Sequence, residues 1–258
     1  MSRLAAVDAQ TFWMSAKIPN DQFLLYAFAG DPGGLDGALA TVRRRAEGCA
    51  DLRVYIADDC PARYPRWAPR AVTDEQFVVH PAGADWAGCL DAVAGLAGAQ
   101  LDPTRMAWRL HVFPQVSGVP GTGTAVVAVL QIVHALADGT RTAEIAAWLF
   151  GREVPVPSIV PARRGNPLVR GVAAARAHRQ LLADIEAGRL PAPPPPRPLL
   201  PTNTQPAGRA RIRTLVRDRR ALTAAVPGST VTVAALVAIG TALAGQLRSS
   251  PVDRLGAE

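Results

Sequence analysis

The sequence predicts an α/β fold in which helices flank a mixed β-sheet. Short apolar runs typical of strands alternate with helical periodicity over the first 152 residues. One of these runs, AVVAVLQIV at residues 125–133, is apolar almost throughout and rich in β-branched residues, as expected of a strand covered on both faces. Hydrophobic residues make up 49% of the 258 residues, which is enough for a sizeable core.

Periodicity and turn signals place the elements of this sheet in order. The first 79 residues are expected to hold a helix near residues 8–14, a strand at 23–28, a helix at 35–45, and strands at 52–56 and 76–79. A Gly/Pro turn at residues 31–34 separates the first strand from the helix that follows it. The next 71 residues are expected to hold a helix rich in alanine and glycine at 86–97, strands at 108–113 and 125–133, and a helix at 141–150.

The character of the chain changes after Gly151. An arginine-rich segment at residues 163–189 leads into LPAPPPPRPLLP, whose prolines exclude a continued helix and favour an extended conformation. We expect this part to be a linker. A basic strand at residues 210–216 and an apolar helix at residues 231–247 are expected beyond it.

Charge and composition narrow the classes of partner. The formal charge of +7 comes almost entirely from arginine, because Lys17 is the only lysine among 28 basic residues. Such a balance favours an anionic lipid surface, the phosphates of coenzyme A or nucleic acid as partners. Nucleic acid is disfavoured, because aromatic residues that could stack on bases make up only 5% of the chain.

Cysteine content and hydropathy bear on disulfides, metal binding and cellular location. The three cysteines have neither a CxxC pair nor a nearby histidine at metal-ligand spacing, so no disulfide scaffold and no metal site is expected. The N-terminal sequence lacks the apolar core of a signal peptide, and the apolar stretch at residues 231–245 is shorter than the ~20 residues that cross a bilayer. The sequence therefore predicts a cytoplasmic protein.

The segment QIVHALADG, residues 131–139, contains the candidate catalytic group. His134 follows the buried strand, and imidazole, with an unperturbed pKa of ~6.5, is the side chain best suited to take a proton from an alcohol near pH 7. Asp138 is expected to fix the turn by hydrogen bonds or by pairing with an arginine, and Gly139 to let the backbone turn closely. The alternative is a core histidine at a strand end, with Asp138 as a helix-capping residue.

Several segments together resemble the bacterial wax ester synthase/diacylglycerol acyltransferase family, within the chloramphenicol acetyltransferase-like, condensation-domain superfamily. His134, Asp138 and Gly139 resemble the end of its HHxxxDG motif, in which the second histidine is the base, whereas Val133 replaces the first histidine. Four further segments resemble family motifs in the same order: Asp8 with Phe12 and Trp13 (DxxFW), residues 77–80 (FDxxxH), LDPTRMAW at residues 101–108 (LDRxRPLW), and Pro201–Asn203 before a basic stretch (PLNxxxxxxR).

The resemblance implies a fold and a domain organisation. Residues 1–152 would form the half-domain that carries the HxxxDG motif, residues 153–208 a basic and proline-rich linker, and residues 209–258 the start of a truncated second half. Family members have a second half of comparable size that closes the sheet and the substrate tunnel. Two smaller departures are Met106-Ala107 in place of Pro-Leu and Thr232-Val233 in place of Asn-Asp.

The resemblance also implies an activity. His134 would take the proton from a diacylglycerol or a long-chain alcohol as its oxygen attacks the thioester of acyl-CoA, which is a co-substrate rather than a bound cofactor. A second hypothesis is a non-catalytic, truncated family member that binds lipid or a partner protein. A third is a condensation-type enzyme acting on carrier-bound acyl groups. The arginines and aliphatic residues of segment 167–190 leave open a peripheral association with a membrane or lipid-droplet surface, although a solvated helix explains the same pattern.

Overall fold

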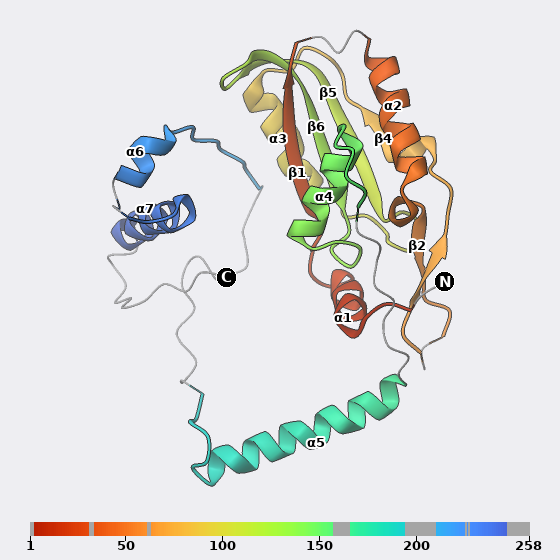
Figure 1. Cartoon of the computed structure of the whole chain (residues 1–258), viewed down its shortest axis with the longest axis vertical. Coiled ribbons are helices and arrows are strands. Elements are labelled where there is room, and N and C mark those ends of the chain that lie inside the picture. The colour runs from red at the N-terminus through yellow and green to blue at the C-terminus, as the bar shows by residue number, and fades with distance from the viewer. Residues whose placement is uncertain are drawn as a thin grey trace. The chain divides into compact units, whose positions relative to one another are not determined.

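The structure of the protein, a computed structural model, describes residues 3–30, 34–60, 63–156, 166–193, 210–224, 226 and 228–246. The chain divides into two compact units, Met1–Ile212 and Arg213–Glu258. The first unit contains both β-sheets of the described residues, and Figure 1 labels most of its elements.

The core of the first unit is a four-stranded mixed sheet. Its strands are ordered β1 (Gln22–Ala29), β6 (Gly123–Ile132), β5 (Trp108–Val119) and β4 (Phe77–Val79). The pairs β1/β6 and β6/β5 are antiparallel, whereas β4 pairs with β5 in parallel. The predicted fully covered strand is β6, an inner strand that is buried from residue 127 to residue 132. The predicted fold class, a mixed sheet with flanking helices, is confirmed.

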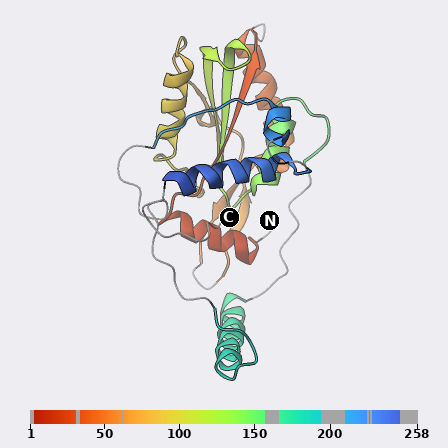
Figure 2. The same ribbon diagram turned by 90° about the vertical axis from the view of Figure 1, so that its left-hand side faces the viewer.

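Helices cover both faces of this sheet. Helix α3 (Trp86–Leu96) lies on one face, where Cys89 and Val93 pack against residues of β5 and β6. Helices α2 (Leu35–Gly48) and α4 (Gly139–Leu149) lie on the other face, and their buried residues join a second, larger cluster. Figure 2 shows the sheet between these two helical layers. Helix α1 (Ala6–Ser15) contributes Ala9 to the larger cluster.

Short elements connect these layers, and they correct two sequence-based boundaries and add one strand. A small two-stranded sheet pairs β2 (Val54–Ala57) with β3 (Arg66–Pro69), and β3 was not predicted. Leu52 belongs to a 3-10 turn rather than to β2, because Arg53 N–H donates to the carbonyl of Ala50. The turn before β4 includes Gln76, which forms a capping box with Thr73.

One buried tryptophan joins the 3-10 turn before β2 to the large sheet. Trp108, the first residue of β5, has no exposed surface, and its indole Nε1 donates to the carbonyl of Leu52 at 2.8 Å. Its ring packs edge-on against Phe77 of β4, with ring centroids 5.7 Å apart. A buried tryptophan needs a partner for its N–H, and this one is satisfied while filling the core.

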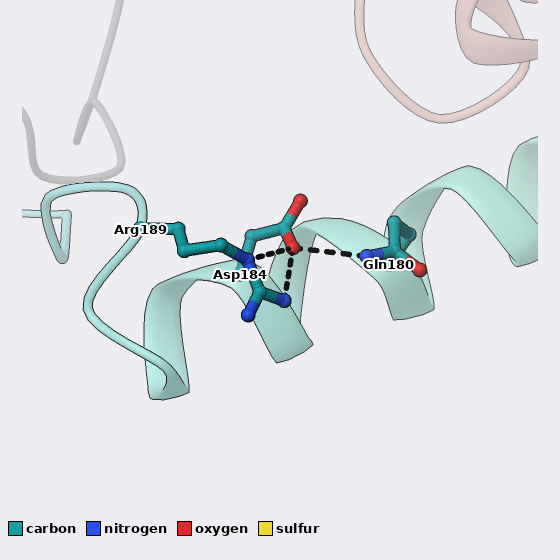
Figure 3. A network of polar contacts seen from close by, with 3 residues as sticks. All are labelled: Gln180, Asp184 and Arg189. Atoms are coloured by element: carbon teal, nitrogen blue, oxygen red, sulfur yellow. Dashed lines mark hydrogen bonds and ion pairs between the residues drawn. The ribbon is translucent and has the colours of Figure 1, made fainter.

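The segment predicted as a linker contains a long helix. Helix α5 (Pro167–Glu186) begins with Asn166 as its N-cap and a proline at its first position, a favourable start for a helix. At its C-terminal end, Asp184 accepts hydrogen bonds from Gln180 Nε2 at 2.9 Å and from the Arg189 guanidinium at 2.6 and 2.9 Å (Figure 3). The side chains of α5 that the structure describes are exposed or only partly buried.

The described part of the second unit includes two helices. Helix α6 (Arg219–Ala224) was not predicted, whereas α7 (Val231–Gln246) matches the expected apolar helix up to residue 246. The predicted strand at residues 210–216 is wrong, since these residues form neither helix nor strand. The Pro201–Asn203 segment lies outside the described residues. No helix in the described ranges is long and apolar enough to cross a membrane.

Candidate functional site

His134 lies in a tight turn immediately after the inner strand β6. The strand ends at Ile132, and the next amide, that of Val133, donates to the carbonyl of Ala107 at 3.0 Å. A second bond, from Leu136 N–H to the Val133 carbonyl at 2.9 Å, closes the turn. Val133 and Leu136 are buried, whereas the side chain of His134 is exposed. The turn therefore fixes the backbone of His134 and presents its imidazole at the surface.

The two nitrogens of the His134 ring differ in their surroundings. Nδ1 lies 3.3 Å from the carbonyl oxygen of Ala137 and contacts Nε2 of Gln22. Nε2 of His134 makes no hydrogen bond within the part of the chain that the structure describes. Nε2 is therefore the ring nitrogen open to an incoming group.

Gln22, the first residue of β1, is held on three sides. Its Cα pairs with Ile132 in the sheet, which brings β1 beside the end of β6. Its Nε2 donates to the Ala137 carbonyl at 2.7 Å, and its Oε1 accepts from the hydroxyl of Thr142 at 3.1 Å. Thr142 lies in α4 and is completely buried. Sequence patterns did not single out Gln22 or Thr142, because the β1/β6 pairing that brings them to His134 is not visible in a single sequence.

Asp138 is the N-cap of α4. Its carboxylate accepts from the backbone N–H of Arg141 at 2.8 Å, which is the helix-capping role that the alternative interpretation gave to it. The guanidinium of Arg141 forms an ion pair with Asp51 instead, and both side chains are largely buried. A capping carboxylate at the start of a helix stabilises it by about 1 kcal/mol.

Gly139 differs from the sequence-based expectation. It is the first residue of α4, its φ is not positive, and a Cβ added to it would meet no atom within 4 Å. The local backbone therefore does not require glycine.

A carboxylate from helix α1 shares the electrostatic environment of the site. Burial raises the pKa of Asp8 above its usual value, and the neighbouring charge of Asp138 acts in the same direction. Arg141 and His134 act in the opposite direction and favour the ionised carboxylate. Asp8 belongs to the N-terminal DxxFW resemblance, so the structure brings this segment near the HxxxDG turn.

Two other histidines form a structural network on the opposite side of the sheet. His80 Nε2 lies 3.2 Å from His111 Nδ1, and His111 Nε2 lies 3.0 Å from Gln131 Oε1. Gln131 Nε2 in turn donates to Asp21 at 2.7 Å and to the Ala99 carbonyl at 2.9 Å. His111 is buried with both ring nitrogens engaged, as expected of a structural histidine.

A surface pocket of the first unit does not include His134. It is lined by residues that include Leu52, Val54, Arg70 and Gln76. In the described ranges, no three histidine, cysteine or acidic side chains are close enough to hold a metal ion. The role of His134 as a catalytic base stays a prediction.

Comparisons with known proteins find structural similarity to parts of longer chains. No protein-family model and no curated protein matches it. Among solved structures, it is similar to the X-domain from teicoplanin biosynthesis (19% identity, TM-score 0.46, 72% of this chain and 39% of that one). It is also similar to the condensation domain of the Monacolin K polyketide synthase MokA (16% identity, TM-score 0.46, 72% of this chain and 42% of that one). A third similar structure is the wax ester synthase/diacylglycerol acyltransferase from Marinobacter aquaeolei VT8 (19% identity, TM-score 0.43, 75% of this chain and 48% of that one). The chain thus spans less than half of each of these proteins.

Proposed function

We propose that this protein is an O-acyltransferase that moves a long-chain acyl group from acyl-CoA to an alcohol, with His134 as the general base. The observation that carries the proposal is the position of His134. Its exposed imidazole follows an inner strand, and the turn fixes its backbone. Its Nε2 makes no hydrogen bond to the described residues. This arrangement coincides with the HxxxDG sequence, whose resemblance supplies the substrate class.

The proposed reaction needs no covalent enzyme intermediate. Nε2 of His134 takes the hydroxyl proton as the alcohol oxygen attacks the thioester carbonyl carbon, and the carbon–sulfur bond then breaks. The departing thiolate takes the proton back from the imidazolium, which restores the neutral ring. In the base form the ring proton lies on Nδ1, and the Ala137 carbonyl at 3.3 Å is placed to accept it.

The proposed partners are acyl-CoA and a diacylglycerol or long-chain alcohol, with no bound cofactor and no nucleic acid. We also propose a cytoplasmic location. Peripheral association with a membrane or lipid droplet would involve the exposed arginines and aliphatic residues of α5. One of the arginines in this region, Arg189, is already paired with Asp184 (Figure 3), which reduces the positive charge available to a lipid surface.

One observation favours a second function, a non-catalytic protein that binds lipid or a partner protein. The apolar helix α7 exposes several large side chains, namely Val231, Val233, Leu236, Val237 and Ile239. Contiguous exposed apolar surface is uncommon in monomers and often marks a binding surface. This function would require no chemistry from His134.

An assay of thiol release separates the two functions. The purified chain should release free coenzyme A thiol from a long-chain acyl-CoA only when an alcohol is present. Replacing His134 by alanine should lower the rate by about 10²- to 10⁴-fold, the usual contribution of a positioned general base. His178→Ala, which removes an exposed histidine of α5, is the matched control and should have no effect. Full activity in His134→Ala would exclude the mechanism, and an inactive unmodified chain would favour the binding function.

A further inference from the structure

The terminal amide of Gln22 has one orientation that satisfies its neighbours. The Ala137 carbonyl oxygen lies 2.7 Å from one terminal atom of this side chain. A carbonyl oxygen only accepts hydrogen bonds, so the atom that faces it must be the amide nitrogen, Nε2. The hydroxyl of Thr142 on the other side can donate to Oε1, as it does at 3.1 Å.

This orientation determines what Nδ1 of His134 meets. The same Gln22 nitrogen that donates to Ala137 also contacts Nδ1, and its second hydrogen is available for that contact. A neutral imidazole has one protonated nitrogen and one accepting nitrogen. If Nδ1 carried the proton, two hydrogens would face each other at this contact. Nδ1 is therefore the acceptor, and the single ring proton lies on the exposed Nε2.

The surrounding structure holds Gln22 in this orientation. Thr142 is fully buried in α4, and the pairing of Gln22 with Ile132 fixes the start of β1 against the end of β6. Turning the amide by 180° would set Oε1 against the Ala137 carbonyl oxygen and leave that acceptor without its donor. Losing this hydrogen bond is unfavourable, because the carbonyl oxygen would be left without a donor.

We propose that Gln22 is a positioning residue that sets the tautomer of His134 and keeps the ring proton on Nε2 in the resting protein. The consequence for catalysis rests on the proposed acyltransferase function, in which Nε2 must be free of its proton to act as a base. The Gln22 amide must then leave Nδ1, so that a proton on Nδ1 can be donated to the Ala137 carbonyl, 3.3 Å away. Gln22 thus keeps His134 from acting as a base until its amide leaves Nδ1.

The tautomer can be read directly, without any activity. Long-range ¹H–¹⁵N spectra of ¹⁵N-labelled protein at pH 8.5, where an unperturbed imidazole is neutral, distinguish protonated from unprotonated ring nitrogens. The His134 signals are assigned by their loss in His134→Ala. In the unmodified chain we expect a protonated Nε2 and an unprotonated Nδ1. A protonated Nδ1 in the unmodified chain would overturn the proposal, whether or not any variant folds.

A variant of similar size tests the cause of this preference. Gln22→Met keeps the length of the side chain but removes the donor, which leaves the Ala137 carbonyl as the polar neighbour of Nδ1. The ring proton should then move to Nδ1. Gln180→Met, the same change in the exposed helix α5 (Figure 3), should leave the His134 signals unchanged. An unchanged tautomer in folded Gln22→Met would also overturn the proposal.

The thiol-release rate separates this inference from the proposed function. If His134 is the base, Gln22→Met should release thiol severalfold faster than the unmodified chain, because the restraint on Nδ1 is gone. A slower rate in this variant, with the tautomer shifted as expected, would show that Gln22 does not restrain the base. Absence of activity in every variant would count against the acyltransferase, while the spectra would still decide the tautomer.

Discussion

Adjacent residues of the HxxxDG turn have opposite environments. Val133 is 3% exposed and belongs to the larger core cluster, whereas the next side chain, His134, is exposed. Val133 stands where the family that this chain resembles has a histidine, and in this chain the position belongs to the core. Replacing Val133 by a polar imidazole would bury it without an identified partner, at a cost of about 1–3 kcal/mol. The hydrophobic residue at this position is explained by packing alone.

Asp138 caps helix α4 through a side-chain oxygen, so a substitution can remove its negative charge and keep the cap. Asparagine caps a helix about as well as aspartate, so Asp138→Asn should leave the free energy of unfolding within about 0.5 kcal/mol of the original value. Asp138→Ala removes the acceptor for the Arg141 amide and should cost about 1 kcal/mol. Urea denaturation of the three proteins measures both differences. Equal stability of all three would show that the cap contributes nothing.

At the scale of elements, a polar chain crosses the end of the sheet. It starts at His80, which follows β4, and continues through His111 in β5 and Gln131 in β6 to Asp21, directly before β1. Both bonds from Gln131 Nε2 go to acceptors, so its Oε1 must accept from His111 Nε2–H. His111 Nδ1 must then accept from His80 Nε2–H. The chain therefore requires His111 to be neutral, because its Nδ1 must accept, whereas His80 can donate from Nε2 whether its ring is neutral or charged.

This requirement predicts how stability depends on pH. Burial lowers the pKa of His111 and also that of His80, below the ordinary value of 6.5. As the pH falls below 6.5, the unfolded chain binds protons that the folded chain does not, so the free energy of unfolding should decrease toward the folded pKa values. Denaturation at pH 7.5, 6.5 and 5.5 should show this decrease. NMR titration should give both histidines midpoints below 6.5, and higher midpoints would contradict the prediction.

Most elements of the sheet could be predicted from the sequence, because their residues have a clear hydrophobic period. Strand β3 was missed, since only Trp67 and Ala68 of its four residues are buried and so short a segment has no period. The basic segment at residues 210–216 alternates like a strand, but the pattern alone cannot provide a partner strand. Strand existence depends on pairing across the fold as well as on local pattern.

The candidate site could be predicted only in part for the same reason. His134 and Asp138 stand in one short motif, so the local sequence is enough to select them. Gln22 contacts His134 only because β1 pairs with β6, and the order of strands in the sheet is not encoded in any local pattern. The role of Gly139 was inferred from residue type, whereas its backbone conformation proved to be ordinary.

At the scale of the whole molecule, the two hydrophobic clusters belong to the first unit. Every buried member of either cluster lies between Leu4 and Leu149, and the second unit begins at Arg213. Removing residues 213–258 should therefore change the free energy of unfolding of the sheet by no more than about 0.5 kcal/mol. Near-ultraviolet circular dichroism of the buried tryptophans, followed during thermal unfolding, measures this change. A fall of several kcal/mol would show that the second unit stabilises the first.

The pairing of β1 with β6 also determines when the site can form during synthesis. Gln22 and His134 are 112 positions apart, so β1 leaves the ribosome long before the strand that completes its pairing. At typical rates of translation this interval is roughly ten seconds, during which the apolar strand FLLYAF has no partner. A nascent chain in this state is a substrate for chaperones, and contacts so distant in sequence slow folding. The contact between Gln22 and His134 can thus form only after the sheet closes, and in a growing chain it would report that closure.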